Sequence, residues 1–275
     1  MFAPITRSYS TPFAGAPAAG TDLPPFQRNA LTFPRSPQQN LAFLAAWQRM
    51  FRGSGFDFDY HFMWDHHRDA GQYAMAQVLH QDCVHLRDIG LDGMVSCQNQ
   101  RVFFPTGLGM TAMGRTLWNR SMPFDAIARD YFQAAFGAEG ERVRAYLQAI
   151  SEHMAPRLIR GEGNAEEKAA ACCRLQHVPD LVGALRPHLE SGRRHPDPAV
   201  AASWRILEDH SQFVLLFADA LLTLYGNDVA GAKQKAWELF RWCRDTEPRL
   251  HPVFDVFEFQ TTLAPLFGIP RSEVQ

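Results

Sequence analysis

Hydrophobic and polar residues alternate along residues 56–65, which is the clearest periodic pattern in the chain. Aromatic side chains occupy the even positions, which are Phe56, Phe58, Tyr60, Phe62 and Trp64. Apart from Met63, the odd positions are ionisable and comprise Asp57, Asp59, His61 and Asp65. Successive side chains of a β-strand point to opposite faces, so this pattern predicts a strand with one aromatic face and one ionisable face.

The segments on either side predict that this strand lies parallel to its neighbours. Capping residues and helical periodicity predict helices over residues 36–51 and 69–90. Further short strands are predicted over residues 2–9 and 93–98. Strand, helix, strand, helix, strand makes two βαβ units, whose strands pair in parallel. Parallel strands are normally covered on both faces, so we expect the ionisable face to be buried or to line a cavity.

The periodicity becomes helical after Phe104-Pro105 and stays so to the end of the chain. The predicted helices cover residues 123–137, 139–154, 165–191, 198–225, 229–246 and 253–267. The expected fold class is therefore α/β plus α, with about three parallel strands followed by an all-helical region. This division places two structural regions at residues 1–105 and 106–275.

Composition excludes some classes of partner and gives a first expectation of location. The chain has 275 residues, of which 46% are hydrophobic, enough for a substantial core. The net charge is −2, from 27 basic and 29 acidic residues, so we expect neither a nucleic-acid nor a membrane partner. No signal peptide and no apolar run of about 18 residues is present, which favours a cytoplasmic protein.

The ionisable face of the 56–65 strand provides the first candidate site. Ligands of parallel sheets bind at the carboxyl ends of the strands, where Asp57, Asp59, His61 and Asp65 gather. With a rise of about 3.3 Å per residue, the first two would lie deep and Asp65 at the rim. The alternative interpretation is an internal hydrogen-bonded network that only orders the sheet.

Polar residues also follow the other two predicted strands. The third strand ends in Gln98, Asn99, Gln100 and Arg101, and the first ends in Arg7 and Tyr9. Amides and a guanidinium group suit a polyhydroxylated ligand better than an apolar one, although ordinary solvated loops have the same composition. Trp64 is either a flat platform for a sugar ring or part of the aromatic packing face.

We expect no metal and no cofactor. His61, His66 and His67 lack the spacing of a metal site, and the five cysteines also lack it. Gly107-Leu108-Gly109 is not followed by Lys-Ser or Lys-Thr, so it does not match a phosphate-binding loop.

Several segments resemble a bacterial family catalogued as domain of unknown function 4838, a glycoside-hydrolase-like group. The resemblance covers about residues 1–140, and the segments that carry it are 2–7, 56–66, 90–94 and 103–109. Residues 114–119, Gly-Arg-Thr-Leu-Trp-Asn, are similar to the segment that follows the barrel in α-glucuronidase-like and hexosaminidase-like enzymes.

The resemblance implies that the strands are the last three of a (β/α)₈ barrel, which a preceding segment or partner chain would complete. It implies catalytic positions at Asp59 and Asp65, helping to position or polarise the substrate. The sugar-binding wall would consist of Arg7, Tyr9, His61, Trp64, Gln98, Gln100 and Arg101. We expect a carbohydrate ligand without hydrolysis by this chain alone. The alternatives are a non-catalytic sugar-binding module and a helical protein-interaction module.

Overall fold

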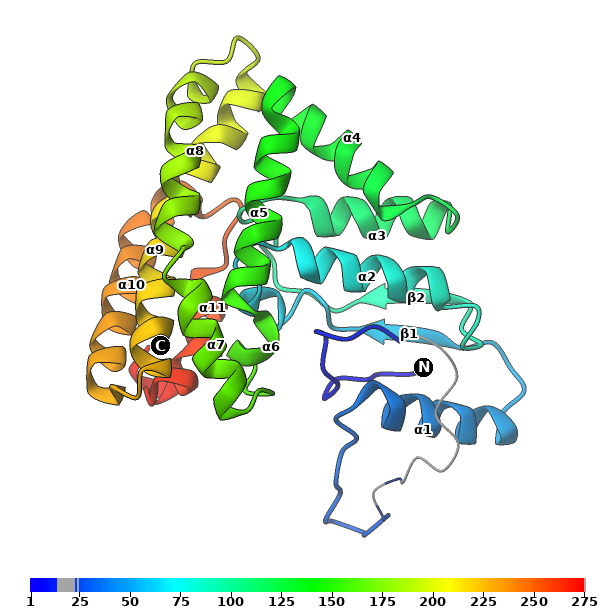
Figure 1. The fold of residues 1–275 in the computed structure, drawn as a ribbon. Helices are drawn as coiled ribbons and strands as arrows, with labels where there is room; N and C mark the ends of the chain where they lie inside the picture. Colours follow the sequence, from blue (N-terminus) through cyan, green and yellow to red (C-terminus); the bar gives the residue numbers. More distant parts are fainter. Residues whose placement is uncertain (14–22, 24, 275) are drawn as a thin grey trace.

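The computed structural model describes residues 1–13, 23 and 25–274, and the chain within these ranges is mostly helical (Figure 1). The elements of the first half are α1 (Pro37–Met50), β1 (Phe56–Asp59), α2 (Tyr73–His85), β2 (Gly93–Ser96), α3 (Leu108–Trp118) and α4 (Phe124–Phe136). The remaining helices are α5 (Gly140–Met154), α6 (Pro156–Ile159), α7 (Ala165–Leu175), α8 (Val178–Arg193), α9 (Pro198–Tyr225), α10 (Val229–Leu250) and α11 (Val256–Leu263).

The predicted fold class, a partial barrel of about three parallel strands followed by a helical domain, is wrong. The described residues contain only two strands, each four residues long. The predicted first strand is reduced to a single bridge between Phe2 and Asp57. Pro4 has no N–H to donate, and the amide of Arg7 turns back to the carbonyl of Pro4. Residues 3–7 therefore turn away from the sheet soon after Phe2.

The pairing between the two strands is parallel, as the sequence predicts. Phe56 is in register with Gly93 and Asp59 with Ser96, and α2 makes the crossover between them. On the other edge of β1, the amide of Phe2 donates to the carbonyl of Phe56 at 2.9 Å. The spatial order is thus Phe2, β1, β2, which brings the N-terminal residues beside the ionisable side chains of β1.

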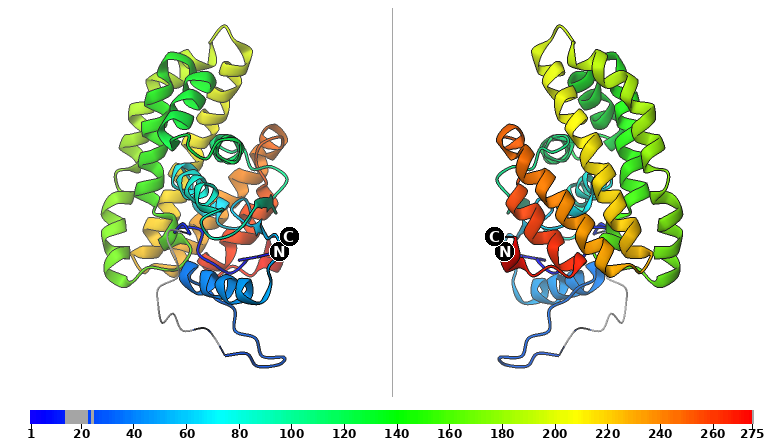
Figure 2. Two further views of the ribbon diagram at one scale, coloured as in Figure 1. Left: turned by 90° about the vertical axis from the view of Figure 1, so that its right-hand side faces the viewer. Right: turned by 90° about the vertical axis from the view of Figure 1, so that its left-hand side faces the viewer.

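The C-terminal helices form a layer with α9 at its centre. The helices α8 and α10 pack against α9 from opposite sides, as Figure 2 shows, and α7 and α4 also contact it. The predicted helix over residues 198–225 is α9 itself, whereas the predicted helix over 165–191 is divided into α7 and α8. In the described part of the chain, every helix is too short or too polar to cross a membrane.

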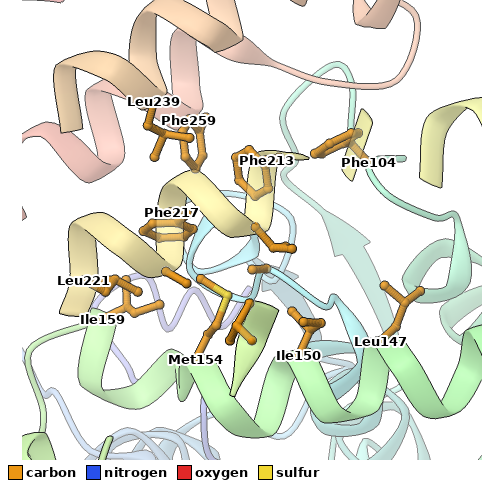
Figure 3. Close-up of a cluster of buried hydrophobic side chains, with 14 of the residues drawn as sticks. Phe104, Leu147, Ile150, Met154, Ile159, Phe213, Phe217, Leu221, Leu239 and Phe259 are labelled. Carbon is orange, nitrogen blue, oxygen red and sulfur yellow. The ribbon is translucent and has the colours of Figure 1, made fainter. Parts of the chain in front are cut away.

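Aromatic side chains fill the core where α9 meets the first half of the chain (Figure 3). The ring of Phe213 lies 5.4 Å from that of Phe104 and 5.2 Å from that of Phe259, measured between centroids. Tyr73 and Ala76 of α2 belong to the same buried cluster. Side chains from both sides of residue 105, the predicted boundary, therefore pack in one core.

Two glycines of α8 provide a matched test of the packing between α8 and α9. A Cβ added at Gly192 would lie 2.1 Å from the ring of Trp204, which is buried, whereas nothing lies within 4 Å of one at Gly183. We expect Gly192→Ala to lower the free energy of unfolding by about 1–3 kcal/mol through overpacking. We expect Gly183→Ala to raise it by about 0.5–1 kcal/mol, because alanine favours the helix. Urea denaturation checks both, and equal effects of the two substitutions would contradict this packing.

Candidate functional site

The ionisable face of β1 is buried, which confirms the expectation from the sequence. Asp57, Asp59 and His61 are at most 1% exposed, whereas Phe56 on the aromatic face is 39% exposed. The strand ends where the Asp59 carboxylate accepts a hydrogen bond from the amide of His61, at 3.0 Å. This turn directs the imidazole of His61 back toward the carboxylates.

His61 lies between two carboxylates. Its Nδ1 is 2.5 Å from Oδ1 of Asp59, and its Nε2 is 3.1 Å from Oδ2 of Asp82. Burial by itself lowers the pKa of His61, but the negative charges of Asp59 and Asp82 outweigh burial and raise that pKa to about 9. His61 is therefore a buried cation at neutral pH.

Arg7 supplies a second buried cation to the same network. Its Nη2 is 2.5 Å from Oδ2 of Asp82, and its guanidinium group lies over the rings of Phe13 and Tyr9, at 3.7 and 4.4 Å. Asp82 also accepts a hydrogen bond from the amide of Phe13, at 2.6 Å. Burial raises the pKa of Asp82, but Arg7 and His61 more than offset burial and keep that pKa below its usual value.

Asp82 is the member of this network that the sequence analysis missed. It lies on α2, three residues after Leu79 and four before Leu86, and both leucines are buried. The sequence could have indicated Asp82, because its spacing from the two leucines places a carboxylate on the core-facing side of the helix. A carboxylate in that position needs a buried cation.

Asp57 differs from the other carboxylates of the network. Burial and the nearby charge of Asp59 raise its pKa well above the usual value, which favours the protonated form. Its Oδ1 has no hydrogen-bond partner among the described residues, and the same holds for Nη1 of Arg7 and Oγ of Ser96. Ser96 is the register partner of Asp59 in β2, so its side chain is on the same face of the sheet.

Asp65 forms a separate ion cluster. Its carboxylate is paired with Arg68 and Arg160, and it accepts a hydrogen bond from the amide of Tyr9 at 3.2 Å. Arg160 also donates to the carbonyl of Arg7, at 2.6 Å. This cluster ties residues 7–9 to the segment that follows α6. The two predicted catalytic residues, Asp59 and Asp65, thus belong to different networks, and partners already engage the carboxylate of each.

Residues 7–13 cover the buried face of β1. The ring of Tyr9 packs edge-on against the imidazole of His61 at 4.7 Å between centroids, and Phe13 is 1% exposed. Tyr9 also lines a cavity of about 130 Å³, together with Ser10, Ala74, Met75, Val78, Ala155, Pro156 and Arg157. Tyr9 therefore touches the cavity as well as His61.

The other predicted ligand contacts lie elsewhere. Gln98 and Gln100 are exposed, and Arg101 pairs with Asp255 at 3.2 Å. Trp64 stacks on Tyr60 at 6.2 Å, in line with the packing interpretation of the aromatic face. The structure thus joins Arg7, Tyr9, Asp57, Asp59 and His61, with Asp65 adjoining through Tyr9. It does not bring Trp64, Gln98, Gln100 or Arg101 to them.

Within the described ranges, no group of three or more His, Cys, Asp or Glu side chains is arranged to hold a metal ion. Comparisons with protein-family models, curated proteins and solved structures each find no match to this chain. The glycoside-hydrolase-like resemblance therefore stays a prediction.

The same isosteric substitution at two carboxylates tests the charge arrangement. We expect Asp82→Asn to lower the free energy of unfolding by about 3–5 kcal/mol, because it leaves Arg7 and His61 without their shared carboxylate. We expect Asp57→Asn to leave the free energy of unfolding unchanged or raise it at pH 7. The reason is that burial and the charge of Asp59 disfavour the ionised form of Asp57, and asparagine is neutral. Denaturant titrations measure the free energy of unfolding of both variants. A larger decrease in Asp57→Asn than in Asp82→Asn would contradict the conclusion that Asp82 is the paired carboxylate and Asp57 the unpaired one.

Proposed function

We propose that this chain binds carbohydrate at the buried face of β1 and does not hydrolyse it alone. The observation that carries the proposal is the set of three unpartnered polar atoms on that face. They are a guanidinium donor, a carboxyl oxygen and a hydroxyl, from Arg7, Asp57 and Ser96. Each buried polar group without a partner costs about 1–3 kcal/mol, so a ligand that satisfies all three binds favourably.

The chemistry of these atoms selects the class of ligand. Sugar hydroxyls both donate and accept hydrogen bonds, and therefore match a face that offers donors and acceptors side by side. The network otherwise pairs Arg7 and His61 with Asp59 and Asp82, so its opposite charges already balance. A neutral polyhydroxylated ligand keeps that balance, whereas a charged ligand would disturb it.

A ligand reaches this face when the ring of Tyr9 moves. The ring is 4.7 Å from the imidazole of His61 and also lines the cavity of about 130 Å³, so its rotation would join that cavity to the polar face. Tyr9 is held at its hydroxyl by one bond, to the carbonyl of Pro4 at 3.2 Å. Opening thus requires the loss of this hydrogen bond and of the contacts that the ring makes with His61 and with the guanidinium group of Arg7.

The same geometry is unfavourable for hydrolysis. Glycosidases use two carboxyl groups facing one substrate, about 5–5.5 Å or 6.5–9.5 Å apart. Here Asp59 is bonded to His61, and Asp65 is paired with two arginines in the separate cluster. Asp57 has the raised pKa of a general acid, but the neighbouring carboxylates are not free to act as the base or nucleophile.

Calorimetric titration with short oligosaccharides tests the proposal. We expect saturable binding without release of nitrophenol from aryl glycosides, and a loss of affinity of about tenfold in Ser96→Ala, corresponding to one lost hydrogen bond. Thr262→Val is the matched control, because its hydroxyl is also buried without a partner among the described residues but belongs to α11. No binding by the wild-type chain, or an equal loss of affinity in Ser96→Ala and Thr262→Val, would refute the proposal. Rapid release of nitrophenol would refute the statement that the chain does not hydrolyse carbohydrate alone.

A further inference from the structure

A second hollow, open to solvent, lies between the end of α2, the end of α3 and the start of β2. Figure 1 shows these three element ends on its right-hand side. Its volume is about 340 Å³, within the range of about 300–1,000 Å³ of small-molecule sites. The hollow, which we call the Trp118 groove, is lined by Cys83, Leu86, Arg87, Leu91, Asp92, Gly93, Thr116, Leu117, Trp118, Asn119 and Arg120.

Three exposed side chains that line this groove are available to a ligand, those of Trp118, Arg87 and Asp92. Trp118, the last residue of α3, is 92% exposed, and among the described residues its ring has no aromatic partner. The guanidinium group of Arg87 and the carboxylate of Asp92 have no ion-pair or hydrogen-bond partner among the residues that the structure describes. Arg120, by contrast, is paired with Asp88 at 3.2 Å. An aromatic plane, a cation and an anion are thus available to a ligand together.

We infer that the Trp118 groove binds one ring of a polysaccharide. The apolar C–H face of a pyranose ring packs on a flat aromatic side chain, as Trp118 provides. Its hydroxyls accept hydrogen bonds from Arg87 and donate them to Asp92. The carboxylate of Asp92 disfavours phosphate, so the groove suits a neutral sugar better than a nucleotide. None of these residues belongs to the buried face of β1, so the two proposals succeed or fail separately.

Electrophoresis in native gels containing a soluble polysaccharide tests this inference, with xylan, glucomannan, dextran and soluble starch as probes. An open groove accepts a ring within a polymer, whereas the covered face of β1 admits only a short sugar. We expect at least one polysaccharide to retard the wild-type chain, and Trp118→Ala to weaken that retardation by about tenfold through the lost stacking contact. Trp118→Phe should keep most of the effect, and Arg87→Ala should weaken it.

Trp47→Ala is the matched control, because Trp47 is also exposed but lies on α1, outside the groove. Circular dichroism verifies that each variant is folded. Retardation unchanged in Trp118→Ala, equal loss in Trp47→Ala, or no retardation by any of the four polysaccharides would overturn the inference. Binding of a single-stranded oligonucleotide that requires Trp118 would also overturn it. Ser96→Ala should leave the retardation unchanged, which separates this site from the face of β1.

Discussion

The burial of ionisable side chains on one face of β1 is the constraint on which the rest of this site depends. A carboxylate removed from water is stable only when a cation or hydrogen-bond donors replace the solvent. Here the cation His61 lies between Asp59 and Asp82, and Arg7 completes the pairing. The network therefore requires three distant parts of the chain, the N-terminal segment, β1 and α2, to meet at one place. It also holds residues 7–13 over the strand, because Asp82 binds the amide of Phe13.

This network separates the carboxylates into two kinds. Asp59, Asp65 and Asp82 are each paired with at least one cation. Asp57 lies beside them with a raised pKa and an unpartnered oxygen. A buried polar group without a partner calls for an explanation, and a bound ligand is one. The difference between paired and unpaired groups on one face is the reason for proposing binding without hydrolysis.

Local patterns in the sequence predicted the local features well. The alternation along residues 56–65 identified the buried and outer faces of β1, and the βαβ order identified its parallel pairing with β2. The third predicted strand forms as β2 but ends at Ser96, two residues earlier than predicted, and Arg101 joins Asp255 near the C-terminal helices instead of the site. The partial barrel failed because turns at Pro4 and His61 end the extended segments early. The pairing of Asp82 with Arg7 joins residues 75 positions apart, which no local periodicity reveals.

The most direct test of the network is the titration of the His61 imidazole by NMR, with its signal assigned by its absence in His61→Gln. A cation held between two carboxylates should titrate with a pKa of about 9. Because an unfolded histidine titrates near 6.5, the stability that His61 contributes should be complete below about pH 6.5 and lost as the pH rises through 9. A pKa at or below 6.5 in the folded protein would contradict this account, because it would mean that Asp59 and Asp82 do not hold a charged His61 between them.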